Sequence, residues 1–263
     1  MTIRVGVGGW TYEPWRGVFY PEGLAQKREL EYAARALTAI EINATYYGRQ
    51  KPQSWRNWAA AVPTGFKFSL KASRYSTARK KLAEGRQSVE TFLGQGFSEL
   101  GDKLGPINWQ FAEGKAFDRD DFARFLDMIP DAQDGVLLRH ALEVRDKSFA
   151  DPAFIDLARA RNMAVVFADS YDFPSIEAQT ADFTYARLQR AWSSSIPGMS
   201  VSSARKRCPS GEAMKAQACS WVRRVLSASV MWNTCSVSSL FATSLRKWPQ
   251  ALSGRIPVIL RSG

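Results

Sequence analysis

AIEINATYYGRQKPQSWRNWAAAVPTGFKFSLK, residues 39–71, holds two short runs with β-strand character and one segment with helical character. The runs are Ala39–Asn43 and Lys67–Lys71, and the segment between them spans residues 51–61, with Pro52 near its start as at many helix beginnings. A strand, a helix and a second strand in this order predict a βαβ unit with parallel strands.

The same alternation extends from the N-terminus to about residue 190. The predicted strands are Arg4–Gly8, Ala39–Asn43, Lys67–Lys71, Ile107–Gln110, His140–Arg145, Ala164–Asp169 and Phe183–Leu188. The predicted helical segments are 23–36, 51–61, 86–100, 118–129 and 151–162, with at most a short helix at 174–181. The length of 263 residues suits one (β/α)₈ barrel of about 250 residues. We therefore expect an α/β fold of the TIM type with seven recognisable βα steps and an eighth strand that is lost or irregular.

The composition of the chain changes near residue 190. Residues 1–190 carry 26 Lys and Arg against 24 Asp and Glu, whereas residues 191–263 carry 10 against Glu212 alone. The second segment also holds all three cysteines and 16 of the 25 serines. The net charge of +11 thus belongs mostly to the tail, so it gives the first segment no basic surface for nucleic acid. We expect two parts: an incomplete barrel domain, 1–190, and an anomalous Ser- and Arg-rich tail, 191–263.

A change of reading frame in the coding DNA would explain this tail. Codons that encode residues 241–245 can, when they are read two nucleotides later, encode Arg-Tyr-Phe-Ile, which is similar to a barrel strand. A basic linker and an unusual C-terminal domain are the alternatives. We expect a tail that is out of frame and poorly ordered, and sequencing of the source DNA across codons 185–263 tests this.

Other sequence features bear on location and cofactors. The N-terminus has no basic leader before an apolar stretch, and no run of about 18 apolar residues occurs, so we expect a cytoplasmic protein with no membrane contact. The cysteine spacing and the single histidine, His140, support neither a metal site nor a disulfide framework, and we expect no cofactor. His140 begins its predicted strand, which favours a structural role.

Polar residues gather on one face of the predicted strands, near their carboxyl ends. Side chains alternate between the two faces of a strand, and the carboxyl ends of barrel strands build the active sites of such folds. The predicted pocket contains Glu41, Asn43, Lys71, Gln110, Glu143, Arg145, Asp169 and Arg187, with Trp10 and Tyr12 from the first loop.

The residue types in this pocket indicate its chemistry. Lys71, Arg145 and Arg187 can hold a phosphate or carboxylate group, and Glu41 with Glu143 are candidate catalytic residues as an acid/base pair. Trp10 and Tyr12 can stack on a sugar or a base, or can cap the core. We expect a small anionic or polyol ligand, whereas a purely structural ion-pair network is the alternative reading.

Six motifs in order resemble one known family. They are Gly9 to Pro21 (GWTYEPWRGVFYP), Glu41 to Tyr47 (EINATYY), Phe66 to Ala72 (FKFSLKA), Leu100 to Pro106 (LGDKLGP), Glu143 to Arg145 (EVR), and Tyr185 to Leu188 (YARL). The chain resembles the YecE-like family, also called domain of unknown function 72, over residues 3–190. The resemblance implies a TIM-type barrel and the pocket above, but no reaction, because the family's activity is not established.

The chain departs from the family pattern at three positions. Where many members carry histidine, this sequence has Ala78, Asp146 and Gln189, which excludes histidine chemistry. Two other hypotheses stay open beside the binding or turnover of a small phosphorylated or polyol ligand. One is a nucleic-acid-related barrel of the abasic-endonuclease type without a metal site, and the other is a non-functional, frame-disrupted product.

Overall fold

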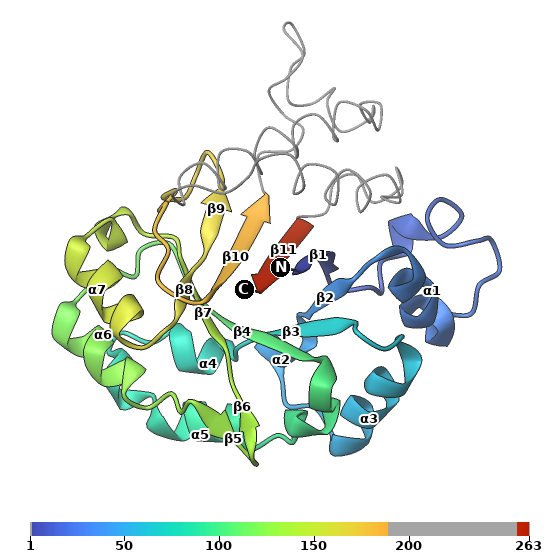
Figure 1. Ribbon diagram of the computed structural model, residues 1–263, viewed down its shortest axis with the longest axis horizontal. Coiled ribbons are helices and arrows are strands. Elements are labelled where there is room, and N and C mark those ends of the chain that lie inside the picture. The colour runs from blue at the N-terminus through green and yellow to red at the C-terminus, as the bar shows by residue number, and fades with distance from the viewer. Residues whose placement is uncertain (1, 189–256, 263) are drawn as a thin grey trace, which may run out of the picture.

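The computed structural model describes residues 2–188 and 257–262 of the chain. Six strands form a parallel sheet that curls, with helices on its outer side (Figure 1). In order across the sheet they are β8 (Ala164–Val165), β7 (His140–Val144), β4 (Leu104–Phe111), β3 (Lys67–Lys71), β2 (Ala39–Ile42) and β1 (Thr2–Gly8). The expected α/β fold is present as this curled parallel sheet, and a complete barrel of seven regular steps is not confirmed.

The sheet continues beyond β1 through an antiparallel strand. Strand β11 (Pro257–Ser262) pairs with β1 on one side and with β10 (Phe183–Leu188) on the other, and β10 pairs in parallel with β9 (Phe167–Asp169). We had expected an eighth strand that is lost or irregular, and in the structure the backbone of β11 pairs with both β1 and β10. The frame change and the poor order expected for the rest of the tail, like Gln189, lie outside the described residues.

The helices follow the predicted segments with shorter bounds. The α-helices are α1 (Glu29–Ala36), α2 (Ala44–Tyr47), α3 (Pro52–Ala61), α4 (Arg74–Thr77), α5 (Arg86–Leu93), α6 (Arg119–Leu126) and α7 (Pro152–Ala160). The 3₁₀ helices are η1 (Glu13–Trp15), η2 (Gln26–Arg28), η3 (Leu82–Glu84), η4 (Phe97–Lys103) and η5 (Lys147–Phe149). A two-stranded hairpin of β5 (Ala132–Gln133) and β6 (Val136–Leu137), which the sequence did not predict, precedes β7.

Local chemistry explains where these helices begin and end. The side chain of Asp151 accepts a hydrogen bond from the amide of Ala153 at 2.7 Å, which caps α7 at its N-terminus. The predicted helix 86–100 is instead two helices: α5 ends at Leu93, and Gly96, directly before η4, has a φ of +84°, a left-handed conformation that does not fit inside an α-helix.

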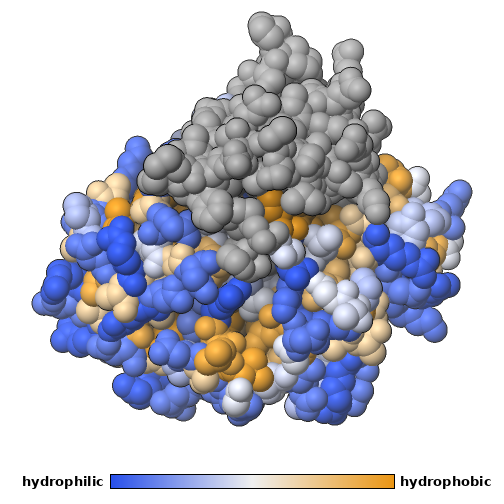
Figure 2. Space-filling view, viewed as in Figure 1, coloured by the Kyte–Doolittle hydropathy of each residue, from blue (hydrophilic) through white to orange (hydrophobic). Residues whose placement is uncertain are grey.

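The apolar core lies between the sheet and its helices. Among its largest fully buried side chains are Trp55 of α3 and Trp109 of β4. Hydrophilic residues cover most of the helical periphery in Figure 2, whereas hydrophobic residues show mainly toward the middle of the face. None of the helices in the described ranges has the length and apolar character that a bilayer crossing needs.

His140 belongs to this core at the start of β7. Its Nδ1 atom accepts a hydrogen bond from the indole of Trp109 at 3.1 Å, so its Nε2 atom carries the proton and donates to the carbonyl of Pro130 at 2.9 Å. Burial lowers the pKa of His140 to about 4, so the ring is neutral at physiological pH. His140 is therefore a buried, hydrogen-bonded residue of the core, and it lies away from the polar carboxyl ends of the strands.

The first strand approaches its neighbour unusually closely at a glycine. A Cβ atom on Gly6 would lie 2.1 Å from the carbonyl oxygen of Ala39 in β2. A larger residue would push β1 away from β2, which would change the position of the loop that follows β1. This loop carries Trp10 and Tyr12.

Candidate functional site

Three charged side chains from distant strands meet inside the curl of the sheet. Arg187 of β10 donates from Nη1 to both carboxylate oxygens of Glu41 of β2, at 2.9 Å each, and to Oε2 of Glu143 of β7 at 3.0 Å. The exposed fractions are 0% for Glu41, 2% for Glu143 and 4% for Arg187. One guanidinium nitrogen therefore bridges two carboxylates that are shielded from water.

Neutral polar side chains complete this network. The amide of Asn108 donates to Glu143 at 2.8 Å and to Glu41 at 3.2 Å, and the amide of Gln110 donates to Glu143 at 2.6 Å. The hydroxyl of Tyr185 donates to Glu41. These hydrogen bonds fix both carboxylates beneath the mouth formed by the strand ends.

The network changes the acidity of its members. Burial alone would raise the pKa of Glu143, but the charges of Arg187 and Arg145 and the hydrogen bond from Asn108 outweigh it and lower this pKa to about 2. Burial and the nearby charge of Glu41 raise the pKa of Tyr185 well above its usual value. At neutral pH, Glu143 is therefore ionised and Tyr185 keeps its proton.

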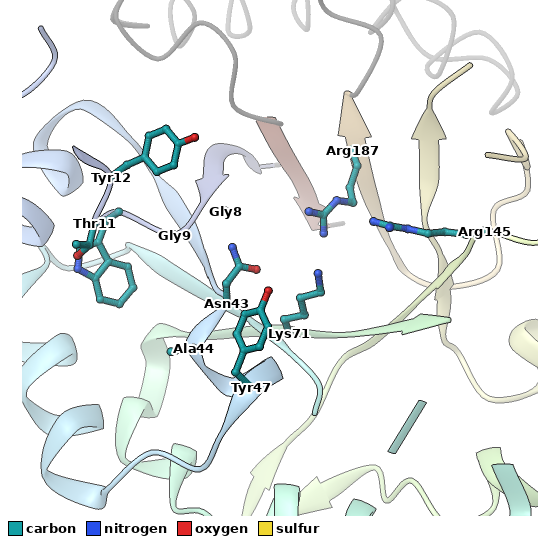
Figure 3. Close-up of a pocket in the computed structure, with 11 residues that line it drawn as sticks. Gly8, Gly9, Thr11, Tyr12, Asn43, Ala44, Tyr47, Lys71, Arg145 and Arg187 are labelled. Atoms are coloured by element: carbon teal, nitrogen blue, oxygen red, sulfur yellow. The ribbon is translucent and has the colours of Figure 1, made fainter. Parts of the chain in front are cut away.

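A cleft of about 570 Å³ lies beside this network. Its volume falls in the range of about 300–1,000 Å³ that is typical of small-molecule sites. The residues that line it are Gly8, Gly9, Trp10, Thr11, Tyr12, Asn43, Ala44, Tyr47, Lys71, Arg145 and Arg187. Figure 3 shows the charged ends of Lys71, Arg145 and Arg187 pointing toward one another, with Tyr12 on the opposite side and Asn43 between.

Lys71, the last residue of β3, differs from the two arginines in its partners. Burial is the main cause that lowers the pKa of its ammonium group, although Glu41 acts in the opposite direction. The ammonium nitrogen lies 4.6 Å from the centroid of the Tyr46 ring. Within the described part of the chain it makes no hydrogen bond and no ion pair. This cation is thus available to a ligand.

Arg145 and Trp10 also line the cleft, and neighbouring side chains hold both of them. Arg145 donates to Glu143 from Nε at 3.2 Å and from Nη2 at 3.0 Å, and its guanidinium lies 4.5 Å from the Phe173 ring centroid. The Trp10 ring contacts Trp58 edge to face at a centroid distance of 5.4 Å. Both side chains present a fixed surface to the cleft.

The structure brings most of the predicted pocket together. The residues that line the cleft as predicted are Trp10, Tyr12, Asn43, Lys71, Arg145 and Arg187. Glu41, Glu143 and Gln110 lie beneath the cleft: the two carboxylates share Arg187, and Gln110 donates to Glu143. Asp169, at the end of β9, is not among the lining residues. A position at the carboxyl end of a strand is therefore not sufficient to predict that a polar residue lines the cleft.

Several residues of the site were not among those predicted. Tyr47 lines the cleft, and Asn108 and Tyr185 hold the carboxylates. The alternation of side chains along a strand could have predicted two of them. Asn108 shares a face of β4 with Gln110, and Tyr185 shares a face of β10 with Arg187. Tyr47 stands in a short helix after β2, where strand alternation carries no information.

Among residues 2–188 and 257–262, no group of three or more His, Cys, Asp and Glu side chains is arranged so that it could hold a metal ion.

Comparison with known proteins gives the family of the chain. Two solved structures resemble it over most of their length: a DUF72 family protein from Thermotoga maritima, at 20% identity with a TM-score of 0.61, and one from Enterococcus faecalis, at 16% with 0.57. The first covers 92% of this chain and 98% of its own, and the second 92% and 93%. At these identities the likeness shows the fold alone. No protein with a curated description matches the chain.

A family model described as "Protein of unknown function DUF72" matches residues 4–253. The match extends past residue 190, where we had expected the resemblance to end. Because it spans most of the sequence, this chain belongs to the DUF72 family, which is the YecE-like family that its motifs resemble.

Proposed function

We propose that the cleft binds a small anionic ligand that carries a phosphate or carboxylate group. The observation that supports this proposal is the ammonium group of Lys71, which lines the cleft without a counter-ion in the described ranges. Arg145 and Arg187 add two positive charges, whereas Glu41 and Glu143 supply only two negative ones. One positive charge is left over, and an anion of the ligand would neutralise it.

We also propose that the curled sheet is the larger part of a TIM-type barrel, with β11 as its irregular eighth strand. The cleft would then lie at the carboxyl ends of the strands, where such barrels bind their substrates.

The acid/base role of Glu41 and Glu143 stays a prediction, and the geometry favours another role for them. Neither lines the cleft, and Glu143, with a pKa of about 2, holds no proton to donate at neutral pH. We propose that the two carboxylates position the guanidinium groups of Arg187 and Arg145. The buried ion-pair network would then hold in place the arginines that bind the ligand in the cleft.

Replacement of Lys71 with methionine tests the proposal. Methionine keeps much of the apolar volume and removes the charge, so we expect the affinity for inorganic phosphate and for ribose 5-phosphate to fall about tenfold or more. Isothermal titration calorimetry measures this affinity. In thermal unfolding, phosphate should raise the Tm of the wild-type protein much more than that of Lys71→Met.

Lys67→Met is the matched control for this experiment. Lys67 begins the same strand, and its ammonium contacts the carbonyl oxygen of Asp102 at the far end of β3. This variant should bind phosphate as the wild-type protein does. Equal affinities for Lys71→Met and the wild-type protein would contradict the proposed site.

A further inference from the structure

We infer that the ligand of the cleft is a nucleoside monophosphate, with its base on the ring of Tyr47. This inference rests on the proposed function, because it assigns the phosphate to Lys71, Arg145 and Arg187. The rest of the cleft is lined mainly by aromatic and small side chains, and this lining is the basis for inferring a base next to the phosphate.

The cleft is divided into a charged side and an aromatic side. In Figure 3 the three cationic groups converge on one side, Tyr12 stands on the other, and the Tyr47 ring lies below Asn43 and beside Lys71 in this view. Trp10 and Tyr12 come from the loop after β1, whereas Tyr47 ends α2. A ligand that fills the cleft therefore meets the three cations on one side, with the Tyr47 ring beside them and Tyr12 across the cleft.

The tyrosine rings of the cleft are exposed, in contrast to most aromatic rings of the core. Tyr47 is 64% exposed and Tyr12 is 39% exposed. The Tyr47 ring is nevertheless held in place, because the Tyr46 ring meets it edge to face at 5.1 Å and the guanidinium of Arg74 lies 5.7 Å from its centroid. A fixed, solvent-exposed ring offers a flat surface on which a base can stack.

The other lining residues favour a flat base over a polyol at this end. Gly8, Gly9 and Ala44 carry little or no side chain, and a Cβ atom on Gly8 would lie 3.0 Å from Nδ2 of Asn43. The glycines thus keep space open beside the Asn43 amide. A buried polyol needs a hydrogen-bonding partner for each hydroxyl group, whereas a base needs apolar surface and a few partners at its edge.

Asn43 can supply such a partner. Its side-chain amide makes no hydrogen bond with any other described residue, and it stands between the charged and aromatic sides in Figure 3. An amide offers both a donor and an acceptor, as the edge of a base does.

Calorimetric titration with four probes tests the inference: inorganic phosphate, ribose 5-phosphate, AMP and adenosine. Stacking on one aromatic ring changes affinity by roughly 5- to 100-fold. We expect wild-type protein to bind AMP about tenfold or more tightly than ribose 5-phosphate, and adenosine to bind more weakly than AMP. Tyr47→Leu should remove the preference for AMP, and it should lower the affinity for AMP much more than that for inorganic phosphate.

Tyr75→Leu is the matched control. Tyr75 is also an exposed tyrosine, and Arg74 lies 5.2 Å from its ring centroid, but it does not line the cleft. This variant should keep the preference for AMP.

The outcomes separate the inference from the function on which it rests. Equal affinities for AMP and ribose 5-phosphate, with no effect of Tyr47→Leu on either, would overturn the nucleotide assignment and leave the anion site intact. Failure of every phosphate-bearing probe to bind would instead overturn the proposed function itself.

Discussion

Replacing Arg187 with methionine is expected to destabilise the protein by about 3–5 kcal/mol. The substitution keeps the apolar stem and removes the guanidinium that bridges Glu41 and Glu143. Both carboxylates are almost completely shielded from water, and neither the amide of Asn108 nor the hydroxyl of Tyr185 carries a compensating charge. Arg145 would still pair with Glu143, but Glu41 would keep its negative charge in the interior without a cation in ion-pair contact.

Urea denaturation at pH 7 measures this loss. Arg139→Met is the control, because Arg139 pairs with Asp182 at 3.5 Å on the surface, where an ion pair contributes about 0–1 kcal/mol. Adding Glu41→Gln to Arg187→Met should restore part of the lost stability, since it removes the buried carboxylate whose ion pair was with Arg187. If Arg187→Met and Arg139→Met had the same midpoint, Arg187 would not neutralise the buried pair.

Acidification should weaken the protein through Glu143, over a defined range. The folded-state pKa of about 2 lies below the ordinary value of 4.5. A group whose pKa is lowered by folding stabilises the folded state above the higher of the two values, and this stabilisation is lost as the pH falls toward the lower one. Glu143 is therefore expected to contribute about 3 kcal/mol at pH 7 and to lose this contribution between about pH 4.5 and pH 2.

Glu143→Gln isolates this contribution. Its free energy of unfolding should lie below that of the wild-type protein at pH 7, and the two curves should converge as the pH approaches 2. Other acidic groups with lowered pKa values, such as Asp121, act equally in both proteins and cancel in the difference. A constant difference from pH 7 to pH 2 would contradict the assignment of this pH dependence to Glu143.

The sequence predicted much of the site because strand alternation is local. Glu41 and Asn43 share a face of one short run, and so do Glu143 and Arg145, so their common direction follows from the backbone alone. It could not predict which strand ends reach the cleft. Gln110 turns toward Glu143 and lies beneath the cleft, because that carboxylate offers it a hydrogen bond at 2.6 Å.

Strand β11 was harder to predict, because its pairing partners lie far away in the sequence. Pro257 to Leu260 form a short apolar run that suits a buried strand, but the run follows a long segment without regular periodicity. Its partners, β1 and β10, come from far earlier in the chain. This pairing depends on the free edges of β1 and β10, which form only when the rest of the sheet has folded. The residues of the run itself therefore do not show which strands it will pair with.

This pairing also sets the order in which the protein can be completed on the ribosome. Thr2 in β1 is the register partner of Ser262 in β11, so β1 lacks one of its neighbours until residues 257–262 have been synthesised. At about 5–20 residues per second, making the segment between β10 and β11 adds on the order of ten seconds. During that interval the edges of β1 and β10 in the nascent chain are open to pairing with other chains.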